Sequence, residues 1–320
     1  MTAQALRVCV CAGEPSGDRY AAALLRALRE QRPDVQIEGV GGGSMAAAGA
    51  TLLERVESLS AIGFAEPLKR LVAHASVFRQ LRRRFLERRY LAVILPFEEA
   101  FFRSRGVPAR FVGHPLLDVP YPSGTAARAA LGLDAGSRVL ALLPGSRPSE
   151  VRRLWPVLRD AARRLRAFHP DLDTVVAAVP GCEYPGSGDL RLSGSGAAVV
   201  LAAADCALCK AGTATLEAAI VDVPSVVVYR TDAWSYAVAR RVARVPFVGL
   251  ANLLAGRAVV PELIQRDARV EPIVAAALPL LDPDGPAARQ QRAAYRGVRA
   301  QLGSPGAARR TAAWALELVA

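Results

Sequence analysis

The sequence predicts an α/β protein made of two Rossmann-like domains that face a cleft. Short apolar runs, each the length of a buried strand, alternate with helical patterns through both halves of the chain. The chain has 320 residues, a length at which a single hydrophobic core stops growing and two domains are favoured. The run PYPSGT at residues 120–125 is the best linker candidate. These observations divide the chain into a first domain, 1–121, and a second domain, 122–320.

The same alternation runs through each half. In the first half, strands are expected at 6–12, 35–40, 90–96 and 109–112, and helices at 19–29, 45–48 and 97–103. In the second half, strands are expected at 137–143, 173–179, 197–202, 205–210 and 225–229, helices at 149–168 and 233–244, a loop at 249–256, and helices from there to the end. Such alternation produces parallel sheets, whose ligands bind beyond the carboxyl ends of the strands. The loops 13–18, 144–147 and 211–217 should therefore face one cleft.

The stretch 205–218 has the pattern of an anion site. A buried strand ends at a turn of small residues, and a helix opens at Thr213 with Glu217 one turn further in. The amino end of a helix presents unpaired N–H groups and a positive partial charge, and Gly212 lets a phosphate approach the backbone. Glu217 is placed to accept hydrogen bonds from a vicinal diol such as a ribose. The pattern predicts a nucleotide-diphosphate pocket in which Gly212 and Thr213 hold phosphate.

A second strand, loop and helix pattern lies near the amino terminus. The strand 6–12 leads into GEPSGD at residues 13–18 and then into a helix. This loop lacks the Gly-Lys-Ser/Thr ending of a Walker A motif and the three glycines of a dinucleotide fingerprint. Two interpretations remain: a second phosphate cradle, or a tight turn in which Asp18 caps the following helix.

The charge favours polyanionic partners. The formal net charge is +12, which suits nucleic acid, nucleotide phosphates or an acidic membrane surface. No zinc finger, aromatic RNA-binding signature or helix-turn-helix pattern is found, so nucleic acid is the weakest of these choices. A basic amphipathic helix is predicted at 68–90, with apolar residues on one face and arginines on the other. It either rests on anionic lipid headgroups or is an ordinary surface helix packed on the sheet.

Cysteine and histidine usage predicts no metal site. Among five cysteines, Cys206 and Cys209 have C-x-x-C spacing, but no second Cys or His pair accompanies them, so core packing is expected. We expect no cofactor. The chain has no uncharged apolar run of about eighteen residues and no signal-peptide pattern, so a cytoplasmic protein is expected.

A series of short motifs gives the chain a family resemblance. They are AGEPSGD at 12–18, GVGGG at 39–43 with Met45, LPFE at 95–98, FVGHP at 111–115, LLPGSR at 142–147 with Glu150, GTATLE at 212–217, VYR at 228–230, VPFVGLANLLAGR at 245–257 and VPEL at 260–263. In this order, and covering nearly the whole chain, they make it resemble the lipid-A-disaccharide synthases. Each motif alone has low specificity, whereas their joint order is highly specific.

The resemblance implies a GT-B-type fold and an inverting glycosyltransferase. Its substrates would be a UDP-activated diacylglucosamine donor and a lipid monosaccharide acceptor, diacylglucosamine 1-phosphate. The protein would act at the inner face of the cytoplasmic membrane, with the anionic membrane surface as a partner. Family members can exchange C-terminal elements, so the last helix, around 307–319, is expected to cross either to the first domain or between the protomers of a homodimer.

The resemblance also assigns roles to individual residues. Substrate or nucleotide contacts fall on Gly13, Ser16, Gly17, Ser146, Arg147, Gly212, Thr213, Glu217, Asn252 and Arg257. Arg147 suits the departing UDP because a guanidinium pairs with diphosphate oxygens in bidentate fashion. The plain alternatives are a surface arginine after a Pro-Gly turn and, for Asn252, a turn-forming asparagine.

One departure from the family concerns the first domain. Family members carry a further strand, helix and strand before Tyr90, including the segment that supplies the aspartate taken as the catalytic base, and this chain lacks them. We therefore expect a reduced N-terminal sheet, and we nominate Asp18 or Glu14 for the base. The stretch 180–196 is also shorter than in the family. The two functional hypotheses are an active transferase and a catalytically impaired or non-catalytic UDP-sugar-binding homologue.

Overall fold

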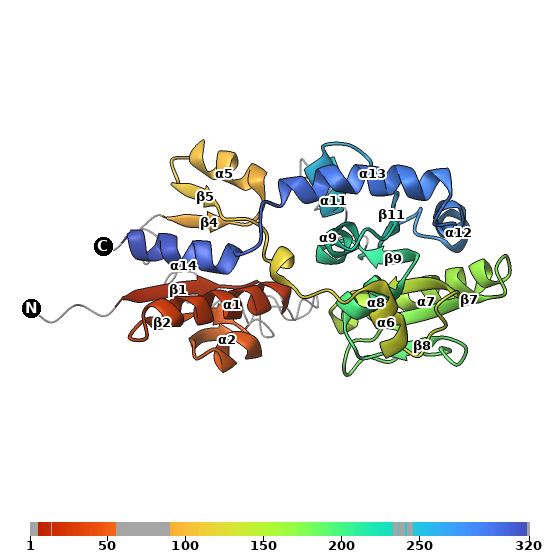
Figure 1. The fold of residues 1–320 in the computed structure, drawn as a ribbon, viewed down its shortest axis with the longest axis horizontal. Helices are drawn as coiled ribbons and strands as arrows, with labels where there is room; N and C mark the ends of the chain where they lie inside the picture. The colour runs from red at the N-terminus through yellow and green to blue at the C-terminus, as the bar shows by residue number, and fades with distance from the viewer. Residues whose placement is uncertain are drawn as a thin grey trace, which may run out of the picture. The chain divides into compact units, whose positions relative to one another are not determined.

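The computed structural model describes residues 6–13, 15–55, 90–232, 236, 241 and 246–318. Glu14, nearly all of the basic helix expected at 68–90 and most of the helix expected at 233–244 lie outside the described residues. The contacts divide the chain into two compact units, whose elements are drawn in Figure 1. Unit 1 comprises Met1–Asp118 and Leu302–Ala320, and unit 2 comprises Val119–Gln301. The chain thus leaves unit 1 just before the expected linker and returns to it near its end.

Unit 1 contains a three-stranded parallel sheet in the order β1-β2-β3. Its strands are β1 (Arg7–Cys11), β2 (Gln36–Gly41) and β3 (Thr51–Arg55), and the helices between them are α1 (Pro15–Gln31) and α2 (Gly43–Ala47). The sequence predicted β1 and β2 but missed β3, whose residues TLLER include no fully buried position. Helix α1 begins at Pro15, four residues before its expected start, because proline is well suited to the first turn of a helix.

A second, two-stranded parallel sheet lies in unit 1. It consists of β4 (Leu91–Val93) and β5 (Ala109–Phe111), joined through α5 (Pro96–Arg103), and is followed by the 3-10 helix η1 (Pro115–Asp118). Within the described residues, neither strand pairs with the β1-β2-β3 sheet. In this part of the chain the N-terminal sheet therefore comes in two pieces, as expected for a reduced sheet.

The carboxyl-terminal helix α14 (Ala307–Glu317) completes unit 1 by packing against α1, as Figure 1 shows. Ala312 of α14 is buried in the same core as Leu25 and Leu28 of α1. The carboxylate of Asp118 accepts hydrogen bonds from the backbone N–H groups of Gly306 and Ala307 at the start of α14. The end of the chain is therefore fixed to the first unit by both apolar and polar contacts.

Unit 2 contains one six-stranded parallel sheet in the order β11-β10-β9-β6-β7-β8. The strands are β6 (Arg138–Leu143), β7 (Leu172–Ala177), β8 (Arg191–Ser193), β9 (Cys206–Lys210), β10 (Ser225–Tyr229) and β11 (Glu262–Ile264). The helices are α6 (Gly124–Ala130), α7 (Pro148–Arg166), α8 (Ala197–Ala203), α9 (Thr213–Ile220), α11 (Leu250–Ala255), α12 (Val270–Ala277) and α13 (Pro286–Gln301), with the 3-10 helix η2 at Leu278–Leu280.

Alternate residues of the central strands pack on opposite faces of this sheet. Leu140 and Leu142 of β6 face a core formed with α7 and α12. Val139, Ala141 and Leu143 face the other core, formed with α6, α8 and α9. Because successive side chains of a strand point to opposite faces, a strand covered on both sides is apolar throughout. The continuous run RVLALL was therefore a reliable sign of a central strand.

Two expectations for unit 2 were wrong. Residues 197–202, expected as a strand, form helix α8, because its sequence AAVVLAA is rich in alanine, the best helix former, and follows Gly196 at the N-cap. Residues 249–256, expected as a loop, hold helix α11, which ends at Gly256 in the left-handed conformation, with φ 64°. The short strands β8 and β11 were missed because three residues are too few for a period-two pattern.

Candidate functional site

The loop between β6 and α7 has a conformation that only glycine allows. Gly145 has φ 128°, and a Cβ there would lie 2.5 Å from Glu150 Oε2 and 2.7 Å from Glu150 Cβ. The Ser146 N–H donates to Glu150 Oε2 over 3.0 Å. Arg147 occupies the N-cap of α7, and no side chain caps this helix. The loop therefore turns sharply into α7 with Ser146 exposed and Arg147 half-buried.

An ion pair connects this loop to the neighbouring strand. Glu150 Oε1 lies 2.9 Å from Nζ of Lys210, the last residue of β9, and β9 pairs directly with β6. The exposed fractions of the two side chains are only 16% for Glu150 and 23% for Lys210, so water screens this pair less than a surface pair. The ion pair holds the loop 144–147 beside the turn 211–213. Sequence reasoning missed Lys210, although a lone charge ending the apolar run CALCK was an available signal.

The turn after β9 opens helix α9 as the sequence predicted. Gly212, with φ 144°, is the N-cap, and no side chain caps the helix. Thr215 closes the first turn by donating its N–H and its hydroxyl to the Gly212 carbonyl, over 3.1 and 2.8 Å. Helices α7 and α9 thus both begin, without a side-chain cap, at the ends of adjacent strands. Their positive partial charges favour an anion at this edge of the sheet.

Glu217 lies on the same helix, one turn after Thr213. Its exposed fraction is 8%, and it lies close enough to Cys209 of β9 for its charge to act on that thiol. Burial is the main reason that the pKa of Cys209 is raised, and the charge of Glu217 adds to it. Glu217 is therefore a mostly buried carboxylate beside the strand that ends at the Gly212 turn.

Asn252 uses its whole amide to fix the backbone before β11. Its Nδ2 donates to the Val260 carbonyl over 2.8 Å and to Glu262 Oε1 over 2.7 Å, and its Oδ1 accepts from the N–H groups of Val259 and Val260, both over 2.8 Å. Its exposed fraction is 1%. Asn252 lies on α11 and not in a loop, so its turn-forming alternative is wrong. Its contacts make it a positioning residue for the segment that follows α11.

Glu262 completes this network and was missed by the sequence reasoning. Its carboxylate accepts hydrogen bonds from the N–H groups of Val248 and Gly249, each over 2.9 Å, at the start of α11. Helix α11 packs against α9, which carries Glu217. Arg257, just after the left-handed Gly256, is exposed and has no ion pair with any described residue. The network therefore holds α11 against the helix that begins the predicted pocket.

In unit 1, Asp18 joins two helices. It lies in the first turn of α1 with an exposed fraction of 5%, and its carboxylate accepts N–H hydrogen bonds from Gly42 over 2.6 Å, Ser44 over 2.9 Å and Met45 over 3.1 Å. Burial acts to raise the pKa of Asp18, but these hydrogen bonds outweigh it and hold the pKa below its usual value. Asp18 thus holds the amino end of α2, whereas the turn interpretation had it capping its own helix.

The other expected residues of this loop lie beside Asp18. Gly13 is exposed after β1, and Ser16 and Gly17 are half-buried in the first turn of α1. The sequence-predicted residues therefore form two groups. Ser146, Arg147, Gly212, Thr213, Glu217, Asn252 and Arg257 belong to unit 2, and Gly13, Ser16, Gly17 and Asp18 belong to unit 1.

The cysteines of β9 are core residues, as expected. Cys206 and Cys209 are fully buried, and burial raises the pKa of Cys206 to about 12. Among the described residues, no group of three or more His, Cys, Asp and Glu side chains is arranged to hold a metal ion. The C-x-x-C spacing therefore reflects packing between the two faces of the sheet.

Comparison with known proteins identifies close relatives. The family model for lipid-A-disaccharide synthetase matches residues 8–90 and 77–315. A lipid-A-disaccharide synthase of Anaeromyxobacter dehalogenans is 38% identical over 368 residues, covering 96% of each chain. One from Myxococcus xanthus is 36% identical over 374 residues, covering 98% of this chain and 97% of the relative.

The first of these alignments is longer than this chain. The first spans 368 positions and this chain has 320 residues, so at least 48 positions of that relative have no counterpart here. The family model matches this chain in two pieces that overlap at residues 77–90. The match is therefore broken at this stretch and not continuous. The missing family segment is expected just before Tyr90, in the same stretch as this overlap.

Solved structures agree on the fold. The calicheamicin glycosyltransferase CalG4 matches with a TM-score of 0.57 at 15% identity, covering 99% of both chains. MurG of Acinetobacter baumannii matches with a TM-score of 0.52 at 15% identity, covering 98% of this chain and all of MurG. Identities this low support the GT-B fold alone, whereas the sequence relatives are specific. The chain is a glycosyltransferase that belongs to the lipid-A-disaccharide synthase family.

Proposed function

We propose that this chain joins UDP-2,3-diacylglucosamine to 2,3-diacylglucosamine 1-phosphate, giving the lipid A disaccharide and UDP. Family membership supports the reaction class. One observation in unit 2 supports the UDP site above all others: two helices without side-chain caps, α7 and α9, begin at adjacent strand ends that the Glu150–Lys210 ion pair holds together. Such a pair of helix starts suits the diphosphate of a nucleotide sugar.

Arg147 is the proposed partner of the departing diphosphate. Negative charge builds up on UDP as the glycosidic bond to the donor sugar breaks, and donors fixed in advance stabilise that charge. Arg147 stands at the start of α7, and its guanidinium has no ion pair within the described residues. Gly212 and Thr213 supply the second helix start. Together they offer a guanidinium and two helix ends to the diphosphate oxygens.

The nucleoside end is proposed to lie along α9 and α11. Glu217 accepts hydrogen bonds from the ribose hydroxyls, since it lies one turn from Thr213. Asn252 acts indirectly, because its amide is already bonded to Val259, Val260 and Glu262. It positions the segment that carries Arg257, whose exposed guanidinium contacts the nucleotide.

The catalytic base is assigned to loop 13–18. The acceptor hydroxyl must lose its proton during the transfer, and a carboxylate with a lowered pKa is a weak base. Asp18 has such a pKa and bonds to three backbone N–H groups, so we assign it to positioning α2 and its own loop. Glu14 is then the proposed base of the two nominated carboxylates.

A second candidate function is binding of a UDP-sugar without catalysis of the transfer. It is favoured by the gap of at least 48 positions, because the family resemblance leads us to expect that the segment with the catalytic aspartate is missing from this chain. The two candidates share the nucleotide site of unit 2 and differ only in the proton transfer. Binding and turnover must therefore be measured separately.

Calorimetric titration of UDP tests the site. Arg147→Ala should weaken UDP binding by about 100-fold or more, because charge-assisted bidentate contacts are lost. The matched control is Arg152→Ala, an exposed arginine one turn further along α7, which should bind UDP normally. Equal affinity in Arg147→Ala and the wild type would remove the pocket assignment.

Turnover distinguishes the two functions. The purified chain is supplied with both diacylated substrates, and disaccharide formation is followed by mass spectrometry. If the wild type forms the disaccharide, and Glu14→Gln binds UDP normally but forms none, the results support the transferase function and Glu14 as its base. UDP binding without any product supports the binding homologue instead.

We further propose peripheral association with the anionic inner surface of the cytoplasmic membrane, and a homodimer. The net charge of +12 supports the membrane contact. In the described part of the chain, no helix combines the length and the apolar character needed to cross a bilayer. Flotation with vesicles containing anionic lipid should carry the protein upward, and neutral vesicles should not. Sedimentation analysis tests the dimer.

A further inference from the structure

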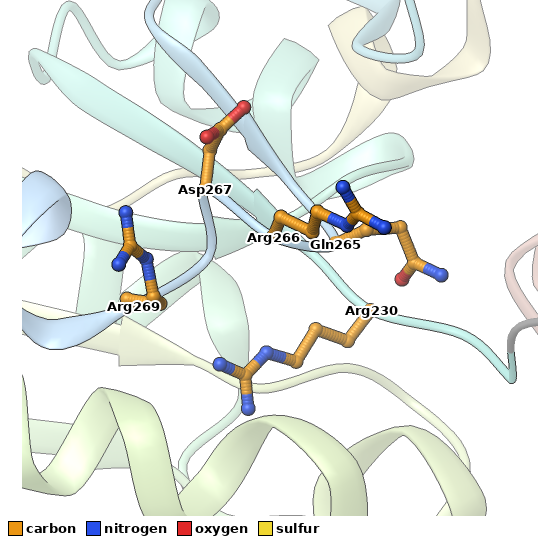
Figure 2. A pocket seen from close by; sticks show the side chains of 5 residues that line it. All are labelled: Arg230, Gln265, Arg266, Asp267 and Arg269. Atoms are coloured by element: carbon orange, nitrogen blue, oxygen red, sulfur yellow. The ribbon is translucent and has the colours of Figure 1, made fainter.

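Arginines gather at the ends of β10 and β11, on the far side of β9 from the β6 loop. Arg230 follows β10 directly, and Gln265, Arg266, Asp267 and Arg269 lie between β11 and α12. These five residues line an open depression of about 540 Å³, shown in Figure 2. The depression lies at the carboxyl edge of the sheet, where parallel α/β sheets bind ligands. Its volume falls within the range of about 300–1,000 Å³ that is common for small-molecule sites.

The charges of this depression are unbalanced. Its lining contains three guanidinium groups and one carboxylate, and none of the three guanidinium groups forms an ion pair with any described residue. The nearby carboxylate of Asp232 is already shared with Arg153 of α7, with Oδ2 and Nη2 3.8 Å apart. The depression therefore has a net positive charge that its own side chains do not neutralise.

The backbone around the depression is fixed in place. Gln265 has a left-handed φ of 53°, and its side chain bonds twice to Thr231, accepting from the N–H over 2.8 Å and donating to the carbonyl over 3.1 Å. Arg230 donates from Nη2 to the Ala268 carbonyl. These contacts clamp the ends of β10 and β11 together. A left-handed non-glycine residue is held only where its surroundings require it, and such residues concentrate at functional sites.

The start of α12 adds to the positive potential. Arg269 is the N-cap of this eight-residue helix, and no side chain caps it. The helix start and the side chains of Arg230, Arg266 and Arg269 thus act on one open depression. In Figure 2 the three arginine side chains point in different directions from two segments. An occupant with three anionic oxygens can accept from more of these guanidinium groups than a carboxylate with two oxygens.

We propose that Arg230, Arg266 and Arg269 form a second anion site, separate from the proposed UDP site, that binds a phosphate monoester. A phosphate monoester suits the site because it is close to a dianion at neutral pH and offers three oxygens to guanidinium donors. The inference goes beyond the proposed function and does not rest on it, because it concerns β10 and β11 and not β6 and β9.

The test is calorimetric titration with inorganic phosphate and with glucosamine 1-phosphate, each with and without saturating UDP. The double variant R266Q/R269Q keeps Arg230 and its backbone contact intact, and it should weaken phosphate binding by about tenfold or more. The control is R289Q/R296Q, which removes two exposed arginines of α13. It should bind phosphate as the wild type does.

A separate experiment measures binding to vesicles of phosphatidic acid and, for comparison, of phosphatidylcholine. It shows whether the bound phosphate belongs to a lipid headgroup or to a soluble molecule. Loss of soluble-phosphate binding in R266Q/R269Q supports a site for small molecules, and loss only of phosphatidic acid binding supports a lipid headgroup site. The proposal is overturned if R266Q/R269Q binds every probe like the control, or if UDP abolishes phosphate binding. Arg147→Ala separates the two proposals, since it should lose UDP and keep phosphate.

Discussion

The two units use the polar groups at their strand ends differently. In unit 2, six parallel strands form one sheet, and the Glu150–Lys210 pair holds two strand-end loops together while leaving Arg147 without an ion pair among the described residues. In the described part of unit 1, the strands form two separate sheets, and the carboxylate of Asp18, in the first turn of α1, is bonded to α2. Unit 2 thus holds the loops of the proposed nucleotide site in place, whereas unit 1 uses its buried carboxylate to hold its own helices. The overlap between the two family-model matches, at residues 77–90, falls in unit 1.

The largest expected effect comes from a substitution in the β6–α7 loop of unit 2. Gly145→Ala places a Cβ 2.7 Å from Glu150 Cβ at a left-handed φ. The variant should destabilise unit 2 by about 3 kcal/mol, from backbone strain and overpacking, and should lose UDP binding. Denaturant titration and calorimetry measure both effects. The control is Gly136→Ala, where nothing lies within 4 Å of the added Cβ. Equal behaviour of the two variants would contradict a fixed β6–α7 loop.

A pH effect follows from His114 in unit 1. Burial lowers its pKa from 6.5 to about 4, and its Nδ1 accepts the Leu116 N–H over 3.2 Å. Between these pH values the unfolded chain binds a proton that the folded chain does not, so stability falls as the pH drops from 6.5 to 4. The loss should reach at most about 3 kcal/mol.

Hydrogen exchange of unit 1 peptides between pH 4 and 7 measures this dependence, after correction for the intrinsic exchange rate. His114→Asn keeps an acceptor near the Leu116 N–H and cannot titrate. It should flatten the dependence of unit 1 and leave that of unit 2 unchanged. The same slope in the variant and the wild type would assign the dependence to other groups.

Asp18→Asn tests the role of the buried carboxylate. An amide accepts N–H hydrogen bonds less strongly than a carboxylate and does not complement the helix dipole of α2, so unit 1 should lose about 2 kcal/mol. Faster hydrogen exchange in α2 would report the loss. Asp34→Asn, which changes an exposed carboxylate paired with Arg32, should have no measurable effect on α2. Full stability with lost turnover would instead favour a direct role for Asp18 in proton transfer.

The smallest effect concerns reactivity and not stability. A hydrogen bond from Cys9 is the main cause that lowers the pKa of Cys11 to about 7, against an opposing effect of burial. The alkylation rate of Cys11 by iodoacetamide should rise with a midpoint near that pH. Cys9→Ala should move the midpoint upward, while Cys206 and Cys209, both buried, should not react in the folded protein. Peptide mass spectrometry follows each thiol, and an unshifted midpoint in Cys9→Ala would contradict the hydrogen bond.

The sequence predicted the parts of the fold that repeat a simple pattern. The central strands of unit 2 are buried on both faces, so runs such as CALCK and SVVVY are apolar almost throughout. The turn at Gly212 was predictable because a strand, a glycine and a helix start follow one another directly. The short edge strands β8 and β11 could not be found this way, since pairing with a neighbour decides their conformation.

Side-chain partners were harder to predict than elements. Asp18 bonds to residues more than twenty positions away, and nothing near it in the sequence marks α2 as its partner. Asn252 and Glu262 form a network whose members look like separate polar residues in the chain. Such contacts depend on how elements pack, and pattern reasoning from one sequence does not reach that level.

The place of α14 has a consequence for how the protein is made. Unit 1 begins the chain, but the helix that covers Leu25 and Leu28 follows the whole of unit 2. Synthesis runs from the amino end. Helix α1 therefore emerges from the ribosome well before α14, the helix that packs on its apolar face. Unit 2 is continuous in sequence and can fold first. The core around Leu25 and Leu28 is then complete only after α14 has emerged.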